Sequence, residues 1–154
     1  MALHLSPAEA RRFSLLLQGW SDTEQAQQMR QYCQHGRIST YDHCISVART
    51  SFWLNRRLHL GGDEAILVRG AFLHDFYLYD WHDCSDICRW HGFVHPAIAL
   101  RNADARYALN DRERNIIASH MWPLTLRHVP RCREAAVVCL SDKTCSLRET
   151  LFCR

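Results

Sequence analysis

Several ionisable side chains in this sequence fall on helix faces that are otherwise apolar. Side chains three, four and seven positions apart share one face of a helix. His43 therefore shares its face with Val47 and Leu54, and Asp142 follows Ala135 and Val138. A buried carboxylate without a partner is costly, because its charge loses hydration that nothing replaces. The side chains that this pattern directs inward are His43, His74, Asp75, His120 and Asp142.

Three histidines and two aspartates that point inward from four helices could satisfy one another around a metal ion. Imidazole and carboxylate together suit zinc, manganese, iron or nickel, and no cysteine is needed. Two simpler explanations stay open at this level. A single inward histidine is often a hydrogen-bonded core residue, and Asp142 could pair with one of the eighteen arginines. The His74–Asp75 doublet alone is weak support, because a second doublet, His82–Asp83, also occurs.

The elements that must position these residues are helices. Capping signals and helical spacing predict seven of them, and no alternating pattern of useful length predicts a strand. We therefore expect an all-α fold, a single-domain helical bundle of about seven helices over residues 1–154. Residues 77–93 look irregular. The predicted helices span 7–18, 21–36, 40–58, 63–76, 96–103, 110–123 and 133–152.

The composition limits the class of protein. A chain of 154 residues with 47% hydrophobic and 23% charged residues is typical of one globular domain. The net charge of +3 comes from scattered basic residues, which does not favour a nucleic-acid polymer as partner. No apolar run reaches the roughly 18 residues of a membrane span. No signal peptide is evident, so we expect a cytoplasmic protein whose eight cysteines are free thiols, without a zinc site at Cys84 and Cys88.

The order of these residues resembles the HD-domain superfamily of metal-dependent phosphohydrolases. That family places a histidine on one helix, a His–Asp doublet at the end of a later helix and an aspartate further on. YDHCISVA supplies His43, GAFLHDF supplies His74 and Asp75, and VVCLSDK supplies Asp142. The resemblance covers residues 39–147. Residues 1–38 carry no such motif, and we expect them to form packing helices or a dimer surface.

A subset of this superfamily binds two metals through two further histidines. HPAIAL offers His95 and IIASHMWPL offers His120, which resembles the binuclear, HD-GYP-like arrangement. His91 competes with His95 for this role, and we prefer His95 because Pro96 would place it at a helix start. The chain departs from the HD-GYP group in two ways. It has no GYP triplet, and Met121 stands where a second histidine would follow His120.

The resemblance implies a ligand set and an activity. His43, His74, Asp75 and Asp142 would hold one ion, and Asp75 would bridge to a second ion held by His95 and His120. Two divalent ions (Fe, Mn, Zn, Ni or Co) would activate water for attack on a small phosphorylated substrate, a nucleotide or another phosphoester. Two alternatives stay open: a non-catalytic HD domain that binds metal or nucleotide, and a di-iron oxygenase of the same superfamily.

Other residues are candidates outside the metal ligands. Lys143 is the only lysine among nineteen basic residues and directly follows Asp142, so we expect it to contact phosphate. A surface or salt-bridged lysine is the simpler alternative. Arg69 and Arg101 are weaker candidates for phosphate. Aromatic residues near the doublet and His120 could stack on a ring or pack in the core: Tyr77, Tyr79, Trp81, Trp90 and Trp122.

Overall fold

The computed structural model describes residues 4–80 and 90–152 of the chain. Within these ranges it has seven α-helices, a 3₁₀ helix and one small antiparallel sheet, which confirms the predicted helical bundle. None of these helices is both long and apolar enough to cross a bilayer. The elements are α1 (Pro7–Leu17), α2 (Glu24–Gln28), η1 (Met29–Gln31), β1 (Cys33–His35), β2 (Ile38–Ser39), α3 (Thr40–Arg57), α4 (Glu64–Leu73), α6 (His91–Asp104), α7 (Asp111–Ser119) and α8 (Arg133–Phe152).

Four helices begin where the capping signals predict. In each case a side-chain oxygen accepts hydrogen bonds from backbone N–H groups that the first helical turn leaves unpaired. The first and the fourth of these caps are complete capping boxes, in which Glu9 and Glu113 reach back to the backbone of the cap residue. The cap residues are Ser6 for α1, Ser39 for α3, Asp63 for α4 and Asn110 for α7.

The prediction of a second helix over 21–36 was wrong for most of its length. The helix α2 has only five residues and is capped by Thr23, and the chain then forms η1 and the antiparallel pair β1–β2. Gly36 has a φ of +58° in the turn between the two strands. A glycine that ends a helix and one that turns a hairpin share this conformation, so the sequence signal was ambiguous.

The start of the helix after the doublet was also predicted wrongly. The helix α6 begins at His91, so Pro96 lies inside it and His95 is not a helix-start residue. At this sixth helical position proline lacks the N–H that would pair with the carbonyl of Gly92, so α6 forgoes one internal hydrogen bond there. Residues 91–93 of the segment expected to be irregular are therefore helical. The expectations that fall on residues 81–89, including His82–Asp83, Cys84 and Cys88, lie outside the described residues.

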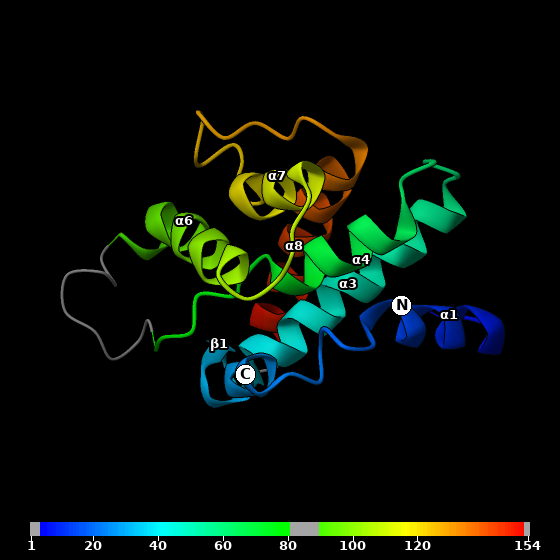
Figure 1. The fold of residues 1–154 in the computed structure, drawn as a ribbon, viewed down its shortest axis with the longest axis horizontal. Helices are drawn as coiled ribbons and strands as arrows, with labels where there is room; N and C mark the ends of the chain where they lie inside the picture. Colours follow the sequence, from blue (N-terminus) through cyan, green and yellow to red (C-terminus); the bar gives the residue numbers. More distant parts are fainter. Residues whose placement is uncertain (1–3, 81–89, 153–154) are drawn as a thin grey trace.

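The bundle is organised around α3, α4 and α8. The helices α3 and α4 pack side by side, α8 packs against α3, and α7 packs on both α4 and α8 (Figure 1). The helix α6 covers α7, and α1 packs on α4. Fully buried apolar side chains fill the space between them, among them Phe52, Leu67, Phe72, Ile116 and Val138. The predicted metal ligands lie on the same helices, so this core also fixes their positions.

One glycine sets how closely α4 and α7 approach. A Cβ atom at Gly70 of α4 would lie 2.5 Å from Cδ1 and 3.1 Å from Cβ of Ile116 on α7. No side chain fits at this position without a shift of one helix. The close approach continues to the helix ends, where the rings of His74 and His120 have centroids 4.9 Å apart.

Candidate metal centre

All six predicted ligands lie in one buried cluster where α3, α4, α6, α7 and α8 meet. Each is less than 10% exposed, although all six are polar or charged. Three overlapping triplets of these residues have donor atoms with the spacing of metal ligands: His43, His74 and Asp75; His74, His120 and Asp142; and Asp75, His95 and His120. They are His43 on α3, His74 and Asp75 directly after α4, His95 on α6, His120 directly after α7, and Asp142 on α8.

The backbone of their own helix orients three of the imidazoles. His74 and His120 are the C-cap residues of α4 and α7, and each Nδ1–H donates to the carbonyl oxygen three residues earlier, at 2.7 and 2.8 Å. Carbonyls at a helix end lack backbone donors, so the rings satisfy them. His95 Nδ1 donates to the carbonyl of His91 at 2.8 Å. Because Nδ1 carries the proton in each neutral ring, Nε2 presents a lone pair to the cluster.

The first group of donor atoms lies between α3, α4 and α8. His43 Nε2 is 3.2 Å from Asp142 Oδ1 and 3.9 Å from Asp75 Oδ2. His74 Nε2 is 3.4 Å from Asp75 Oδ2 and 3.7 Å from Asp142 Oδ1, and it has no hydrogen-bond partner among the described residues. A buried imidazole nitrogen without a hydrogen-bond partner, facing two carboxylates, fits a divalent cation.

The second group lies between α4, α6 and α7. His95 Nε2 and His120 Nε2 are only 2.7 Å apart, and Asp75 Oδ1 is 3.1 and 3.3 Å from them. Asp75 Oδ1 is buried and makes no aligned hydrogen bond with any described residue. With both rings neutral, two nitrogen lone pairs and a carboxylate oxygen would face one another at these distances, which requires either a proton shared between the two Nε2 atoms or a cation. A cation among the three atoms removes this conflict, so the second group also fits a metal ion.

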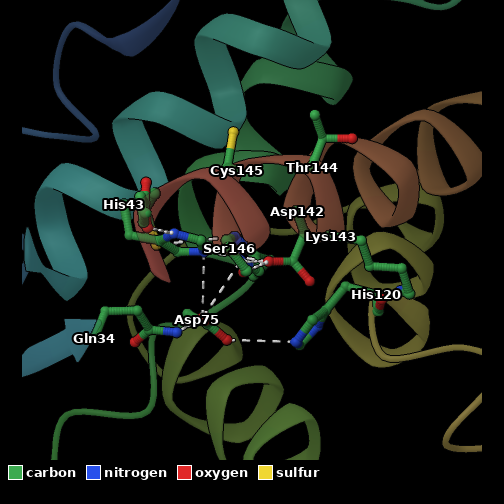
Figure 2. A network of polar contacts seen from close by, with 12 residues as sticks. Gln34, His43, Asp75, His120, Asp142, Lys143, Thr144, Cys145 and Ser146 are labelled. Atoms are coloured by element: carbon green, nitrogen blue, oxygen red, sulfur yellow. Dashed lines mark hydrogen bonds and ion pairs between the residues drawn. The ribbon is translucent and has the colours of Figure 1, made fainter. Parts of the chain in front are cut away.

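Asp75 joins the two groups, since its two oxygens face different histidine pairs. Figure 2 shows its carboxylate between Gln34 and His120, with Asp142 approaching from α8. Gln34 on β1 donates from Nε2 to Asp75 Oδ2 at 2.7 Å. The amide orientation of Gln34 is fixed, because its Oε1 accepts from the hydroxyls of Tyr77 and Thr40. The N-terminal region thus contributes to the cluster as well as to packing.

The charges of the cluster are strongly coupled. Burial opposes the imidazolium form of His43, but hydrogen bonds to Asp142 and Glu149 outweigh it and raise its pKa to about 9. Burial likewise opposes a charged His74, and the charge of Asp75 raises its pKa well above 6.5. The carboxyl pKa values of Asp75 and Asp142 are lowered despite burial, because cationic histidines face them. Without metal, protons on His43 and His74 therefore supply the positive charge that the carboxylates require.

Glu149 is a member of the cluster that the sequence interpretation missed. It is 3% exposed, and its Oε2 lies 2.7 Å from His43 Nδ1. A carboxylate on the outer nitrogen of a ligating histidine fixes the ring and increases the basicity of Nε2. The available signal was spacing, because Glu149 follows Asp142 by seven residues and so shares its face of α8.

We expect the Glu149→Gln variant to bind metal about 10–100-fold more weakly, since outer partners of this kind typically contribute that much to metal affinity. The amide keeps the volume but not the charge that holds the His43 ring. Competition with a chromogenic chelator measures the affinity. The exposed Glu24→Gln variant is the matched control, and equal affinity of the Glu149 variant and the wild type would contradict this role.

A pocket of about 770 Å³ opens onto the cluster, and Asp75, His95, His120 and Asp142 lie at its base. Lys143 lines the same pocket. Its Nζ donates to the carbonyl of His120 at 3.0 Å and approaches the carbonyl and Sγ of Cys139 at 3.3 and 3.1 Å. The lysine thus holds the end of α7 at the edge of the pocket, and its contact with phosphate stays a prediction.

The remaining candidates lie around the cluster rather than in it. His91 Nδ1 is 2.7 Å from the Tyr79 hydroxyl, and its ring stacks on that of His95 at 4.5 Å, so His95 and not His91 supplies the inward nitrogen. Neither Arg69 nor Arg101 lines the pocket. The five cysteines among the described residues are free thiols: Cys33, Cys44, Cys132, Cys139 and Cys145.

Comparisons with known proteins leave the chain unassigned to a family. No protein-family model, no curated protein and no solved structure matches it. The inference of function therefore depends on the residues of the cluster and on the motifs that carry the HD-domain resemblance.

Proposed function

We propose that the cluster holds two divalent metal ions and that the protein is an HD-type, metal-dependent phosphohydrolase acting on a small phosphorylated substrate. The observation that carries the proposal is the convergence of inward Nε2 atoms on a carboxylate that has one oxygen for each histidine pair. The Nε2 atoms of His95 and His120 lie 2.7 Å apart and both are within 3.3 Å of Asp75 Oδ1, a compact set of donor atoms of the kind that a metal ion requires.

The residues divide between two ions. His43, His74 and Asp142 would hold one, His95 and His120 the other, and Asp75 would contribute one oxygen to each. Zinc, manganese, iron, nickel and cobalt all accept this mixture of imidazole and carboxylate. Such ions supply Lewis acidity and lower the pKa of water, which is the chemistry that phosphoester hydrolysis requires.

The charge of the centre favours an anionic substrate. Two divalent ions among three carboxylates (Asp75, Asp142 and Glu149) and four neutral imidazoles leave one positive charge at the base of the pocket. The Lys143 ammonium adds a second positive charge at the pocket wall. A phosphoryl group carries the complementary charge, and the buried position of the cluster strengthens the attraction by excluding water.

The proposal is tested by metal content and turnover together. Wild-type protein purified without chelator is expected to hold close to two ions per chain, and His120→Gln close to one. The exposed His128→Gln variant serves as the matched control and should retain two. Each preparation is assayed for phosphate release from phosphomonoesters and phosphodiesters with Mn²⁺, Fe²⁺, Zn²⁺, Ni²⁺ and Co²⁺.

Three results would contradict the proposal. If the protein bound no metal even after reconstitution, the cluster would have only a structural role. Two bound ions with ligand-induced stabilisation but no turnover would favour the non-catalytic alternative. Oxygen consumption by the iron-loaded protein, without phosphate release, would replace hydrolysis with the oxygenase alternative.

A further inference from the structure

The walls of the pocket over the metal centre differ in character from its base. The base carries the imidazoles and carboxylates, whereas the walls are mostly carbon: Gly92, Met121, Pro123, Leu124 and Leu147. Leu124 and Leu147 are 47% and 63% exposed, so about half or more of their apolar surface is uncovered within the described part of the chain. Uncovered apolar surface beside a polar centre is typical of a site for an amphipathic ligand.

The pocket offers little to recognise a nucleotide. Lys143 is the only basic side chain other than histidine among the described residues that line it, although the chain has eighteen arginines. The Lys143 Nζ already contacts the carbonyls of His120 and Cys139. A di- or triphosphate would bring charges that no further cation on this wall neutralises.

Stacking partners for a nucleobase are also scarce, because the only aromatic rings of described residues that line the pocket are the imidazoles of His91, His95 and His120. No tryptophan, tyrosine or phenylalanine of the described ranges lines the pocket. Tyr77 is buried behind Gln34, where its hydroxyl meets Gln34 and Thr40, and the Tyr79 hydroxyl meets His91. Trp122 is 40% exposed but is not a lining residue. Tyr77 and Tyr79 are thus engaged with other side chains, and Trp122 lies outside the lining of the pocket.

We infer that the pocket selects a phosphomonoester whose organic group is an uncharged aliphatic chain or ring, and that it discriminates against nucleotides. The inference rests on the proposed function for the position of the phosphoryl group, at the metal centre. The organic group then lies along Met121, Leu124 and Leu147. Polar contacts along this path are few, with Ser146 and Thr150 of α8 supplying the hydroxyls.

Non-hydrolysable n-alkylphosphonates from methyl to octyl test the inference, with nucleoside monophosphates and triphosphates as competitors. Affinity is measured by calorimetry on the metal-loaded and the metal-free protein. Burial of each methylene against the wall is expected to tighten binding about fourfold until the pocket is filled. Nucleotides are expected to bind no more tightly than methylphosphonate.

Leu124→Gln and Leu147→Gln are expected to flatten the dependence on chain length, and their exposed positions mean that both variants should fold. Leu140→Gln is the control, because Leu140 is 60% exposed on α8 but does not line this pocket. An unchanged chain-length dependence in both wall variants, or tighter binding of nucleotides than of any alkylphosphonate, would overturn the inference.

The metal-free measurement separates this result from the proposed function. If the centre binds no metal, or metal without hydrolysis, the dependence on chain length still reports the apolar wall. If hydrolysis occurs and the dependence is flat, the proposed function stands and the inferred substrate class is wrong.

Discussion

Replacement of Asp75 by asparagine is expected to have the largest effect of any single change in this protein. Asparagine keeps the volume of the side chain but removes the only charge shared by both groups of donor atoms. We expect metal content to fall from about two ions to well below one. Activity should fall by more than the roughly 10–100-fold typical of outer-shell changes, because Asp75 itself would be a ligand. Elemental analysis and initial rates on the same preparations measure both.

Asp111→Asn is a suitable control for this variant, because the Asp111 side chain is fully exposed on the first turn of α7. It should keep the metal content and rate of the wild type. If Asp75→Asn retained two ions and measurable turnover, the bridging assignment would be wrong. The donor sets of the two groups would then have to be independent of Asp75.

Removal of metal is expected to lower thermal stability by an amount that grows with pH. At a free metal concentration of 100 times its dissociation constant, one ion stabilises a protein by about 2.7 kcal/mol. For a chain of this size this corresponds to roughly 5–10 °C in Tm for each ion. Melting curves before and after treatment with a chelator, from pH 6 to pH 9, give the difference directly.

The direction of the pH dependence follows from His43. Its pKa in the metal-free fold is about 9, above the 6.5 of an ordinary imidazole. Its contribution to stability is therefore fully present below pH 6.5 and is lost as the pH rises to 9. Metal takes the place of these protons, so metal affinity increases over the same range. The Tm difference between loaded and metal-free protein should widen toward pH 9, and a difference that narrows would contradict this account. Ionisable side chains outside the cluster titrate alike in the metal-loaded and the metal-free protein, so their contributions to the Tm difference cancel.

The structure brings the six predicted residues together, and five of them could be singled out by local signals, whereas His95 was preferred for a helix start that the structure does not have. His43 and Asp142 stand out by helical spacing, and His74 follows the apolar stretch of α4. Glu149 and Gln34 were missed for different reasons. Glu149 lay within reach of the same spacing argument, whereas Gln34 reaches Asp75 only because β1 and β2 form a hairpin. The hairpin itself is local, but the hydrogen bond from Gln34 to Asp75 joins residues 41 apart in the chain, which no local pattern contains.

The predicted helix starts also divide into those that a local signal marks correctly and those that it does not. Caps made by one side chain, such as Ser39 and Asn110, were predicted correctly. Pro96 was taken as a helix start, because proline favours that position. In the structure the helix begins five residues earlier, at His91, and this extra length places the His91 ring on that of His95. No side-chain cap marks that start, since Trp90 at the N-cap makes no capping hydrogen bond.

The absence of a side chain at Gly70 has a consequence for the spacing of the two proposed ions. The spacing between His74 and His120 depends on how closely α4 and α7 approach at this position. A methyl group there would act as a spacer between the two helices and move the two halves of the donor set apart. Gly70 therefore controls, at a distance from the donor atoms, how far apart the two groups lie, and its replacement by alanine would lengthen the distance between the two ions that these groups would hold.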